Sequence, residues 1–330
     1  MSSFASKIVD RAFRIAMMGE PKSAEQMLRH SRRVVGLVRP PAMLPDGVTM
    51  RKTTVANEPA VPPGVPAVCV STAKPTTTVL YLHGGAFICG KFATYAGLCG
   101  QIAKRLNARV FWVDYRLAPE MPFPAAPDDA FNAYCALATD YPDDPLVVIG
   151  DSAGGNLTLS TLLRVRDVLK SRKGSKLLRL PVCAVAMSPL VDFAKASPSR
   201  SANGTSDAIL SPRMIEFATE LYLAGHDPKD PYASPIYGDL SGLPPMLLSV
   251  SDTEAVRDDS YRFANSARRA GSSVQLLSRE DRLHAWPVLY TALPEARRDF
   301  AEIVDFMRTH LRYSVAPEKP TPQLRIASAN

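Results

Sequence analysis

Cysteine and histidine are scarce in this chain, and long apolar runs are missing. The 330 residues include five cysteines and five histidines. The cysteines are odd in number and scattered, which argues against a disulfide framework and against a zinc site built from paired cysteines. No apolar run approaches the roughly 20 residues that a helix needs to cross a bilayer. We therefore expect no stable membrane insertion, no metal, and reduced, mostly buried thiols at Cys69, Cys89, Cys99, Cys135 and Cys183.

The first twenty residues do not have the pattern of a secretory signal. Residues 1–20 place Phe4, Ile8 and Ile15 on one face of a helix, interleaved with lysine and arginine. Such a segment is too charged for a secretory signal, so we expect a cytoplasmic protein. Residues 314–330 are rich in proline, serine and alanine and are predicted to form a flexible tail.

The positive charge lies mainly in the first part of the chain. The formal net charge is +7, and residues 1–53 contain ten Lys and Arg residues against four Asp and Glu residues, a net charge of +6. These basic residues are not interleaved with aromatic ones and match no nucleic-acid-binding motif. The sequence therefore predicts a solvated helical face in this region and no nucleic-acid partner.

Six short apolar runs alternate with helix-like stretches from residue 79 onwards. Such runs, without alternation of polar residues, are typical of a mostly parallel sheet that is covered by helices on both faces. The length of the chain suits one α/β domain of this kind. The runs occupy residues 79–82, 110–113, 146–149, 182–187, 246–250 and 274–277.

A Gly-x-Ser-x-Gly motif follows the third of these runs at residues 150–154. A tight turn from strand to helix needs the two glycines, because a Cβ there would collide with the neighbouring element. Such a turn exposes the Ser152 hydroxyl, and the following helix directs N–H groups at any negative charge that develops beside it. We predict Ser152 as the nucleophile of an acyl-transfer reaction. Asp151 and Asn156 are predicted to stabilise the turn through hydrogen bonds.

A second glycine-rich turn, His83-Gly84-Gly85-Ala86, follows the first run. Hydrolysis of an ester or amide passes through a tetrahedral oxyanion, and one fixed N–H donor can contribute roughly 3–4 kcal/mol to its stabilisation. Glycines allow the backbone to approach closely enough to donate. The sequence predicts an oxyanion hole formed by the N–H groups of Gly84, Gly85 and Ala153.

These motifs resemble the hormone-sensitive-lipase-like branch of the α/β-hydrolases, which includes the bacterial family IV carboxylesterases of the Gly-Asp-Ser-Ala-Gly type. Ala86 departs from the pattern, because many members have a third glycine there. Arg116 and Glu120, within one shared segment, are expected to pair inside their own loop. The resemblance extends over residues 65–310 and rests on residues 83–86, 114–120, 150–156 and the segment around residue 284.

The resemblance implies a division of the chain into three parts. An N-terminal helical cap is expected at residues 1–45, and an α/β-hydrolase catalytic domain at residues 46–313. Residues 193–222 are expected to contribute to the cap, and residues 314–330 to form the tail. The apolar face of the cap is expected to line the acyl pocket.

The general base is predicted from the order of the catalytic residues. In this architecture the acid and the histidine follow the serine along the chain. His284 lies in a loop after the run at residues 274–277, and such folds gather their catalytic groups at the carboxyl ends of strands. His226 lies in a turn and His310 in a late helix, so His284 is predicted as the base.

Two residues are candidates for the acid of the triad. Aligning Arg257 and Asp258 with the family's Asp-Pro-Leu-Arg-Asp run places Glu254 in the acid position, about thirty residues before His284. Asp252 is the commoner residue type, but it requires a shift of two residues. Either carboxylate can orient the imidazole. The sequence favours Glu254, with Asp252 as the alternative.

The predicted function is the hydrolysis of short- to medium-chain carboxylic esters through an acyl-enzyme, without a cofactor. A lactone hydrolase or an arylacetamide-type amidase would use the same triad and stays an alternative. A non-catalytic small-molecule receptor on the same scaffold is less favoured, because such receptors lose a triad member and this chain keeps all three. The expected partner is a small ester, and the resemblance also implies a possible homodimer.

Overall fold

A sheet of eight strands forms the centre of the computed structural model, which describes residues 7–9, 11–12, 21–37, 44–55, 64–171 and 177–315. The strand order is β1-β2-β4-β3-β5-β6-β7-β8. β2 is antiparallel to β1 and β4, and all other neighbours are parallel, which confirms the predicted mostly parallel α/β sheet. The strands are β1 (Val48–Val55), β2 (Val65–Thr72), β3 (Thr77–Leu82), β4 (Ala108–Val113), β5 (Leu146–Asp151), β6 (Cys183–Met187), β7 (Met246–Ser251) and β8 (Val274–Arg279).

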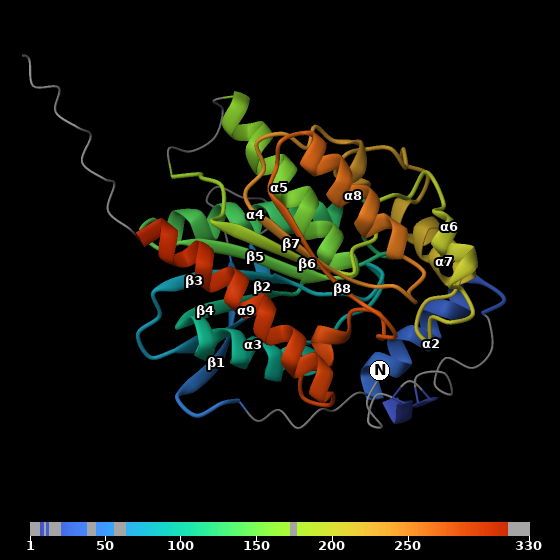
Figure 1. Cartoon of the computed structure of the whole chain (residues 1–330), viewed down its shortest axis with the longest axis horizontal. Helices are drawn as coiled ribbons and strands as arrows, with labels where there is room; N and C mark the ends of the chain where they lie inside the picture. Colours follow the sequence, from blue (N-terminus) through green and yellow to red (C-terminus); the bar gives the residue numbers. More distant parts are fainter. Residues whose placement is uncertain are drawn as a thin grey trace, which may run out of the picture.

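Helices cover both faces of this sheet (Figure 1). In β3, Val79 and Tyr81 pack with the helices of one face, whereas Leu80 and Leu82 pack with those of the other. A strand that is buried on both sides needs apolar residues at nearly every position, which is why each of the six apolar runs forms a strand. One face is covered by α3 (Phe92–Leu106) and α9 (Pro294–Val315), the other by α4 (Ala125–Asp140), α5 (Ala153–Ser171) and α8 (Arg257–Arg269).

β1 and β2 are the two strands that the apolar pattern does not predict. β1 lies at the edge of the sheet, and only its first and last residues, Val48 and Val55, are buried. An edge strand with solvent on most of its side chains carries polar residues that resemble those of a loop. The apolar pattern therefore marks the parallel part of the sheet alone.

Three further helices lie at one end of the molecule (Figure 1). They are α2 (Ala24–Leu37), α6 (Pro198–Ala202) and α7 (Pro212–Leu223). Met27 of α2 is buried against Ile88 and against Ala218 of α7. These contacts place α2 and α7 together over the loop that follows β3.

A guanidinium fixes α2 to the body of the protein. Arg32 donates to the carbonyl oxygens of Ile88 (2.9 Å) and Ala118 (3.1 Å) and pairs with the carboxylate of Glu120 at 2.7 Å. Glu120 therefore binds α2 rather than a residue of its own loop. Arg116 pairs with Asp129 of α4 at 2.7 Å, so the expected pairing of Arg116 with Glu120 is wrong.

The remaining predictions concern the two ends of the chain, the cysteines, membrane-spanning helices and metal ligands. The helix predicted over residues 1–20 lies largely outside the described residues, as does the predicted tail beyond the end of α9 at Val315. All five cysteines are free thiols, and four of them are buried. Of the helices described, none combines the length and apolar character needed to cross a membrane. No cluster of three or more potential metal ligands occurs in the described ranges.

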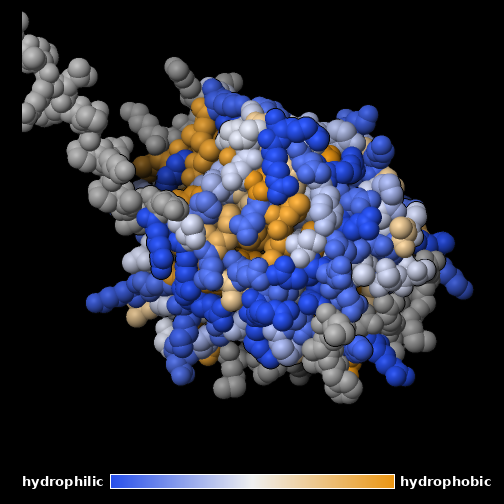
Figure 2. Space-filling model, viewed as in Figure 1, coloured by the Kyte–Doolittle hydropathy of each residue, from blue (hydrophilic) through white to orange (hydrophobic). Residues whose placement is uncertain are grey.

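Figure 2 shows one face of the molecule covered mostly by hydrophilic side chains, with apolar side chains gathered near its centre.

Candidate active site

Ser152 lies at the junction of β5 and α5, at the carboxyl edge of the sheet. Its φ is +52°, in the left-handed region that non-glycine residues rarely adopt. Its N–H donates to the carbonyl oxygen of Met187 at 2.7 Å and holds it there. A Cβ at Gly154 would overlap the carbonyl of Leu82, and a Cβ at Gly150 would overlap the carbonyl of Gly154. The predicted strand–turn–helix is therefore present, and it requires both glycines.

The loops after β7 and β8 bring a carboxylate to a histidine. Nδ1 of His284 lies 2.7 Å from Oε2 of Glu254, and Oε1 of Glu254 accepts the N–H of Ser251 at 3.0 Å. His284 and Glu254 are both buried. Nε2 of His284 has no hydrogen-bond partner among the described residues, and His284 lines a cavity that Ser152 also lines. One ring nitrogen is thus fixed by Glu254, and the other is unpartnered, with no hydrogen bond to Ser152 in this structure.

Asp252, the alternative acid, has different partners. Its Oδ1 accepts hydrogen bonds from the Tyr261 hydroxyl at 3.0 Å and from Oγ of Ser278 at 3.1 Å. These bonds hold the carboxylate against α8 and β8. The geometry therefore brings Glu254, and not Asp252, to His284.

The Glu254 carboxylate makes the imidazole more basic than an isolated buried ring. Burial lowers the pKa of His284. The hydrogen bond and charge of Glu254, together with the charges of Asp207 and Asp151, raise it, so that it lies above its ordinary value. Burial raises the pKa of Glu254, and the bond to His284 acts in the opposite direction. A raised pKa favours proton uptake by Nε2, the atom that would receive the proton of a serine hydroxyl.

In the turn after β3, the N–H of Gly84, one of the predicted oxyanion donors, already has acceptors within the protein. The Gly84 N–H donates to Oδ1 of Asp151 at 3.1 Å and to the Tyr95 hydroxyl at 3.1 Å. This donor is already satisfied, which differs from the prediction for Gly84. The N–H groups of Gly85 and Ala86 have no acceptor in the described part of the chain. The loop has positive φ values at Gly85 (+122°), Ala86 (+54°) and Phe87 (+62°).

His83 fixes the direction of the next peptide group. Its ring stacks between Trp112 and Tyr115, with centroids 4.7 and 4.2 Å away, and its Nδ1 lies 2.7 Å from the carbonyl oxygen of Gly84. Burial lowers the pKa of His83 to about 4, so the ring is neutral near pH 7 and must carry its proton on Nδ1 to make this bond. The C=O and N–H of a trans peptide point in opposite directions. The Gly85 N–H therefore points away from the His83 ring.

Asp151, expected to stabilise the turn, is the centre of a buried hydrogen-bond network. Its carboxylate accepts from the hydroxyls of Tyr81 (3.0 Å) and Tyr95 (3.2 Å) as well as from Gly84. Burial raises the pKa of Asp151 to about 6, against the effect of these bonds. Neither tyrosine was predicted from the sequence. Tyr81 could have been found, because a tyrosine within an apolar run is expected to be buried, and its hydroxyl then needs a hydrogen-bond partner.

Asp151→Asn should lower kcat roughly tenfold, because the amide replaces one acceptor and loosens the Gly84 turn. The charge of Asp151 also raises the pKa of His284. Its removal should therefore lower that pKa and shift the acid limb of the kcat/KM profile to lower pH. Tyr81→Phe is the matched control, since it removes one bond to the same carboxylate and no charge. An acid limb that stays in place in Asp151→Asn, or that moves equally in Tyr81→Phe, would contradict this interpretation.

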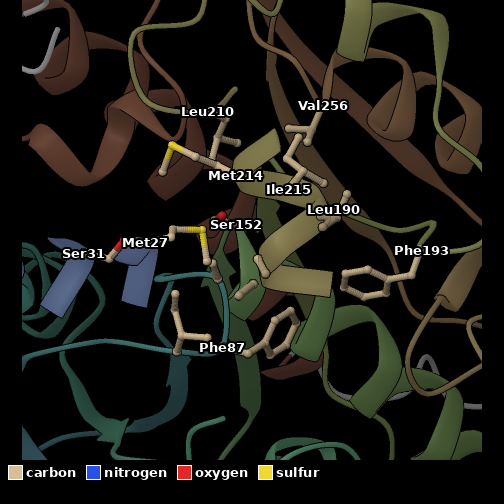
Figure 3. A pocket seen from close by; sticks show the side chains of 14 residues that line it. Met27, Ser31, Phe87, Ser152, Leu190, Phe193, Leu210, Met214, Ile215 and Val256 are labelled. Atoms are coloured by element: carbon tan, nitrogen blue, oxygen red, sulfur yellow. The ribbon is translucent and has the colours of Figure 1, made fainter. Parts of the chain in front are cut away.

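Two apolar cavities meet at Ser152. Met27 and Ser31 of α2 lie on one side of the serine and Phe193 on the other, with Met214 of α7 above it and Phe87 below it in the view of Figure 3. The second cavity extends on the side of His284. The fold, the strained serine at the carboxyl edge and the adjacent histidine–carboxylate pair define an α/β-hydrolase.

Comparison with known proteins agrees with this class. The family model for the alpha/beta hydrolase fold matches residues 79–288. An acetyl-hydrolase of Streptomyces hygroscopicus is 36% identical over 233 residues, which cover 70% of this chain and 75% of that protein. An esterase of Acinetobacter venetianus is 34% identical over 237 residues, which cover 71% of this chain and 75% of the relative.

Solved structures extend the similarity to nearly the whole chain. The crystal structure of an esterase from the bacterial hormone-sensitive lipase family is 31% identical, with a TM-score of 0.81, and the match covers 94% of this chain and 99% of that chain. EstE5, crystallised and soaked with p-nitrophenyl butyrate, is 30% identical with a TM-score of 0.81. The chain belongs to the α/β-hydrolase family, in its hormone-sensitive-lipase-like branch, and is a carboxylic-ester hydrolase.

Proposed function

We propose that Ser152, His284 and Glu254 form the catalytic triad of this esterase, and that it cleaves short- to medium-chain carboxylic esters. The observation that carries the proposal is the buried pair of His284 and Glu254, 2.7 Å apart. The second ring nitrogen of His284 is unpartnered among the described residues, in a cavity shared with Ser152. A fixed Nδ1 and an available Nε2 are what a general base for a serine requires.

The reaction proceeds in two halves at one serine. Nε2 of His284 takes the hydroxyl proton while Oγ of Ser152 attacks the ester carbonyl carbon, and a tetrahedral oxyanion forms. His284 then gives the proton to the leaving alcohol oxygen as the carbon–oxygen bond breaks, which leaves an acyl-enzyme. A water that gives its proton to the same nitrogen attacks the acyl carbon and releases the acid. Glu254 stays ionised and stabilises the charged ring.

The donors of the oxyanion hole are the N–H groups of Gly85, Ala86 and Ala153. Ala153 is the first residue of α5, so its N–H has no partner within the helix and lies at the positive end of the helix dipole. Gly84 holds the loop in place through Asp151 instead of donating to substrate. This assignment replaces Gly84 by Ala86 in the predicted set.

A panel of p-nitrophenyl esters from acetate to laurate should show the highest kcat/KM at short to medium acyl chains, with a fall of at least about tenfold to laurate. The apolar cavity beside Ser152 supports this expectation, as does the name of the acetyl-hydrolase relative. Lactones and arylacetamides belong in the same panel, because one triad serves all three classes. A maximum at laurate, or faster cleavage of a lactone or anilide, would overturn the proposed substrate.

We also propose a division of the chain into a cap and a catalytic domain. Residues 1–45 act as a cap, residues 193–222 contribute to it, and residues 46–313 form the catalytic domain. The α2 residues Met27 and Ser31 support a cap role, because both line the cavity beside the serine. We also propose a cytoplasmic location and a homodimer. Among the described strands β8 pairs on one side only, with β7, which supports its edge as a contact for a second copy. Light scattering of the purified protein would test the dimer.

A further inference from the structure

The two cavities that meet at Ser152 differ greatly in size. The inner cavity has a volume of about 50 Å³, and the outer cavity has a volume of about 230 Å³. The outer cavity therefore offers more than four times the space of the inner one. Both are lined mainly by apolar side chains. Ser31, Ala86, Ile88, Ser152, Leu210 and Met214 line both of them.

The chemistry of the reaction determines which half of an ester faces each cavity. The leaving alcohol oxygen takes its proton from Nε2 of His284, so the alcohol must lie on the side of that ring. His284 lines the outer cavity and not the inner one. The acyl carbon stays bonded to Ser152, and its chain must extend the other way. Of the proposed oxyanion donors, Ala153 lines only the inner cavity, Gly85 only the outer one and Ala86 both, so the oxyanion lies where the two cavities meet.

We infer that the inner cavity holds the acyl chain and the outer cavity holds the alcohol, so that the natural substrates are short-acyl esters of long apolar alcohols. This inference rests on the proposed function. The smaller inner cavity suits a short acyl chain, and the larger outer cavity suits a longer alkyl chain. We expect the outer cavity to accept an octyl alcohol more readily than the inner cavity accepts an octanoyl chain.

The walls of the inner cavity give way less readily than those of the outer cavity. The Phe87 ring is buried and stacks on the Tyr222 ring with centroids 3.7 Å apart, and Phe193 contacts both rings at 6.0 and 5.4 Å. A close-packed aromatic cluster resists displacement by additional methylene groups. Val34 and Leu289, which line only the outer cavity, are partly exposed, so a long alcohol can extend past them towards solvent.

Two isomeric esters test, on the unmodified enzyme, which cavity holds the acyl chain and which holds the alcohol. Octyl acetate has a short acyl group and a long alcohol, and ethyl octanoate has the reverse. Acid release measured in a pH-stat should give a kcat/KM at least about tenfold higher for octyl acetate. Ser152→Ala should release acid from neither ester.

Matched leucine variants test the assignment of each cavity. Leu190 lines only the inner cavity and Leu289 only the outer one, and both are partly exposed. Leu190→Ala should raise kcat/KM for ethyl octanoate by about fivefold or more, because it lengthens the acyl cavity. Leu289→Ala should not raise it, and should lower kcat/KM for octyl acetate through lost contacts.

The outcomes separate this inference from the function on which it rests. Equal or faster cleavage of ethyl octanoate by the unmodified enzyme, with dependence on Ser152, would overturn the side assignment and leave the esterase proposal intact. A rise in octanoate cleavage in Leu289→Ala but not in Leu190→Ala would do the same. If neither ester is cleaved, or if Ser152→Ala cleaves both, the proposed function itself fails.

Discussion

Ser152→Ala should reduce kcat for p-nitrophenyl butyrate by about 10⁴- to 10⁶-fold, because Ser152 carries the acyl chain in the proposed mechanism. The residual rate would come from the oxyanion donors and from binding alone. The substitution keeps the Cβ and the left-handed φ of +52°, so the turn should keep its shape. The free energy of unfolding should change by less than about 1 kcal/mol, as thermal denaturation would measure.

A covalent probe separates loss of the nucleophile from loss of the fold. A fluorophosphonate should add one phosphonyl group to the native enzyme, on the peptide that contains Ser152, and none to Ser152→Ala. Ser171→Ala is a suitable control, since Ser171 is an exposed serine at the far end of the same helix, α5. Turnover near that of the native enzyme in Ser152→Ala would reject the serine mechanism. Labelling of another serine in the native enzyme would reject this assignment of the nucleophile.

Three strands that carry the site, β3, β5 and β7, were predictable because they are buried along their whole length. β8, at the edge of the sheet, is buried at Val274 and Leu277 and was marked by its short apolar run. The serine follows β5, the glycine turn follows β3, and the acid and base follow β7 and β8. All four strands are parallel, so their carboxyl ends meet at one edge. Apolar runs mark such strands in the sequence, and polar or glycine-rich residues directly after them mark the site.

Features that depend on backbone direction were not predictable. Which N–H groups of residues 84–86 point at substrate depends on φ values of +122° at Gly85 and +54° at Ala86. It depends also on the Asp151 carboxylate, which lies on another strand and accepts the Gly84 N–H. A sequence motif records that glycines are needed there and does not record where each amide points.

The pairing of Arg32 with Glu120 was also beyond sequence reasoning. The two residues are 88 positions apart, and the bond forms because α2 crosses the loop after β4. Nothing in the composition of either segment identifies the other as a partner. Local pairing of Arg116 with Glu120 was the simplest expectation, and the buried Asp129 on α4 is the partner that Arg116 finds instead.

Replacing the acid of the proposed triad should also lower kcat strongly. Glu254→Gln should lower kcat by about 10³- to 10⁴-fold. The Ser251 N–H binds Oε1 at 3.0 Å and would keep the amide oxygen there, so that the amide NH₂ would face Nδ1 of His284. An NH₂ group donates to Nδ1 and forces the ring proton onto Nε2. His284 could then no longer accept the serine proton.

Asp252→Asn is the matched control, because it is the same chemical change two residues away. Asp252 accepts bonds from Tyr261 and Ser278, and its loss should leave kcat near that of the native enzyme. Large loss in Asp252→Asn with normal turnover in Glu254→Gln would reverse the assignment of the acid.

The pH profile of the residual activity gives an independent test of Glu254. His284 must be neutral to act as a base, and the charge and hydrogen bond of Glu254 raise its pKa above the ordinary value. The acid limb of kcat/KM in the native enzyme should therefore lie above about pH 6.5, the ordinary pKa of histidine. Glu254→Gln removes both effects while burial continues to lower the pKa, so the limb should move to lower pH. A limb at the same pH in both proteins would mean that Glu254 does not contact the base during turnover.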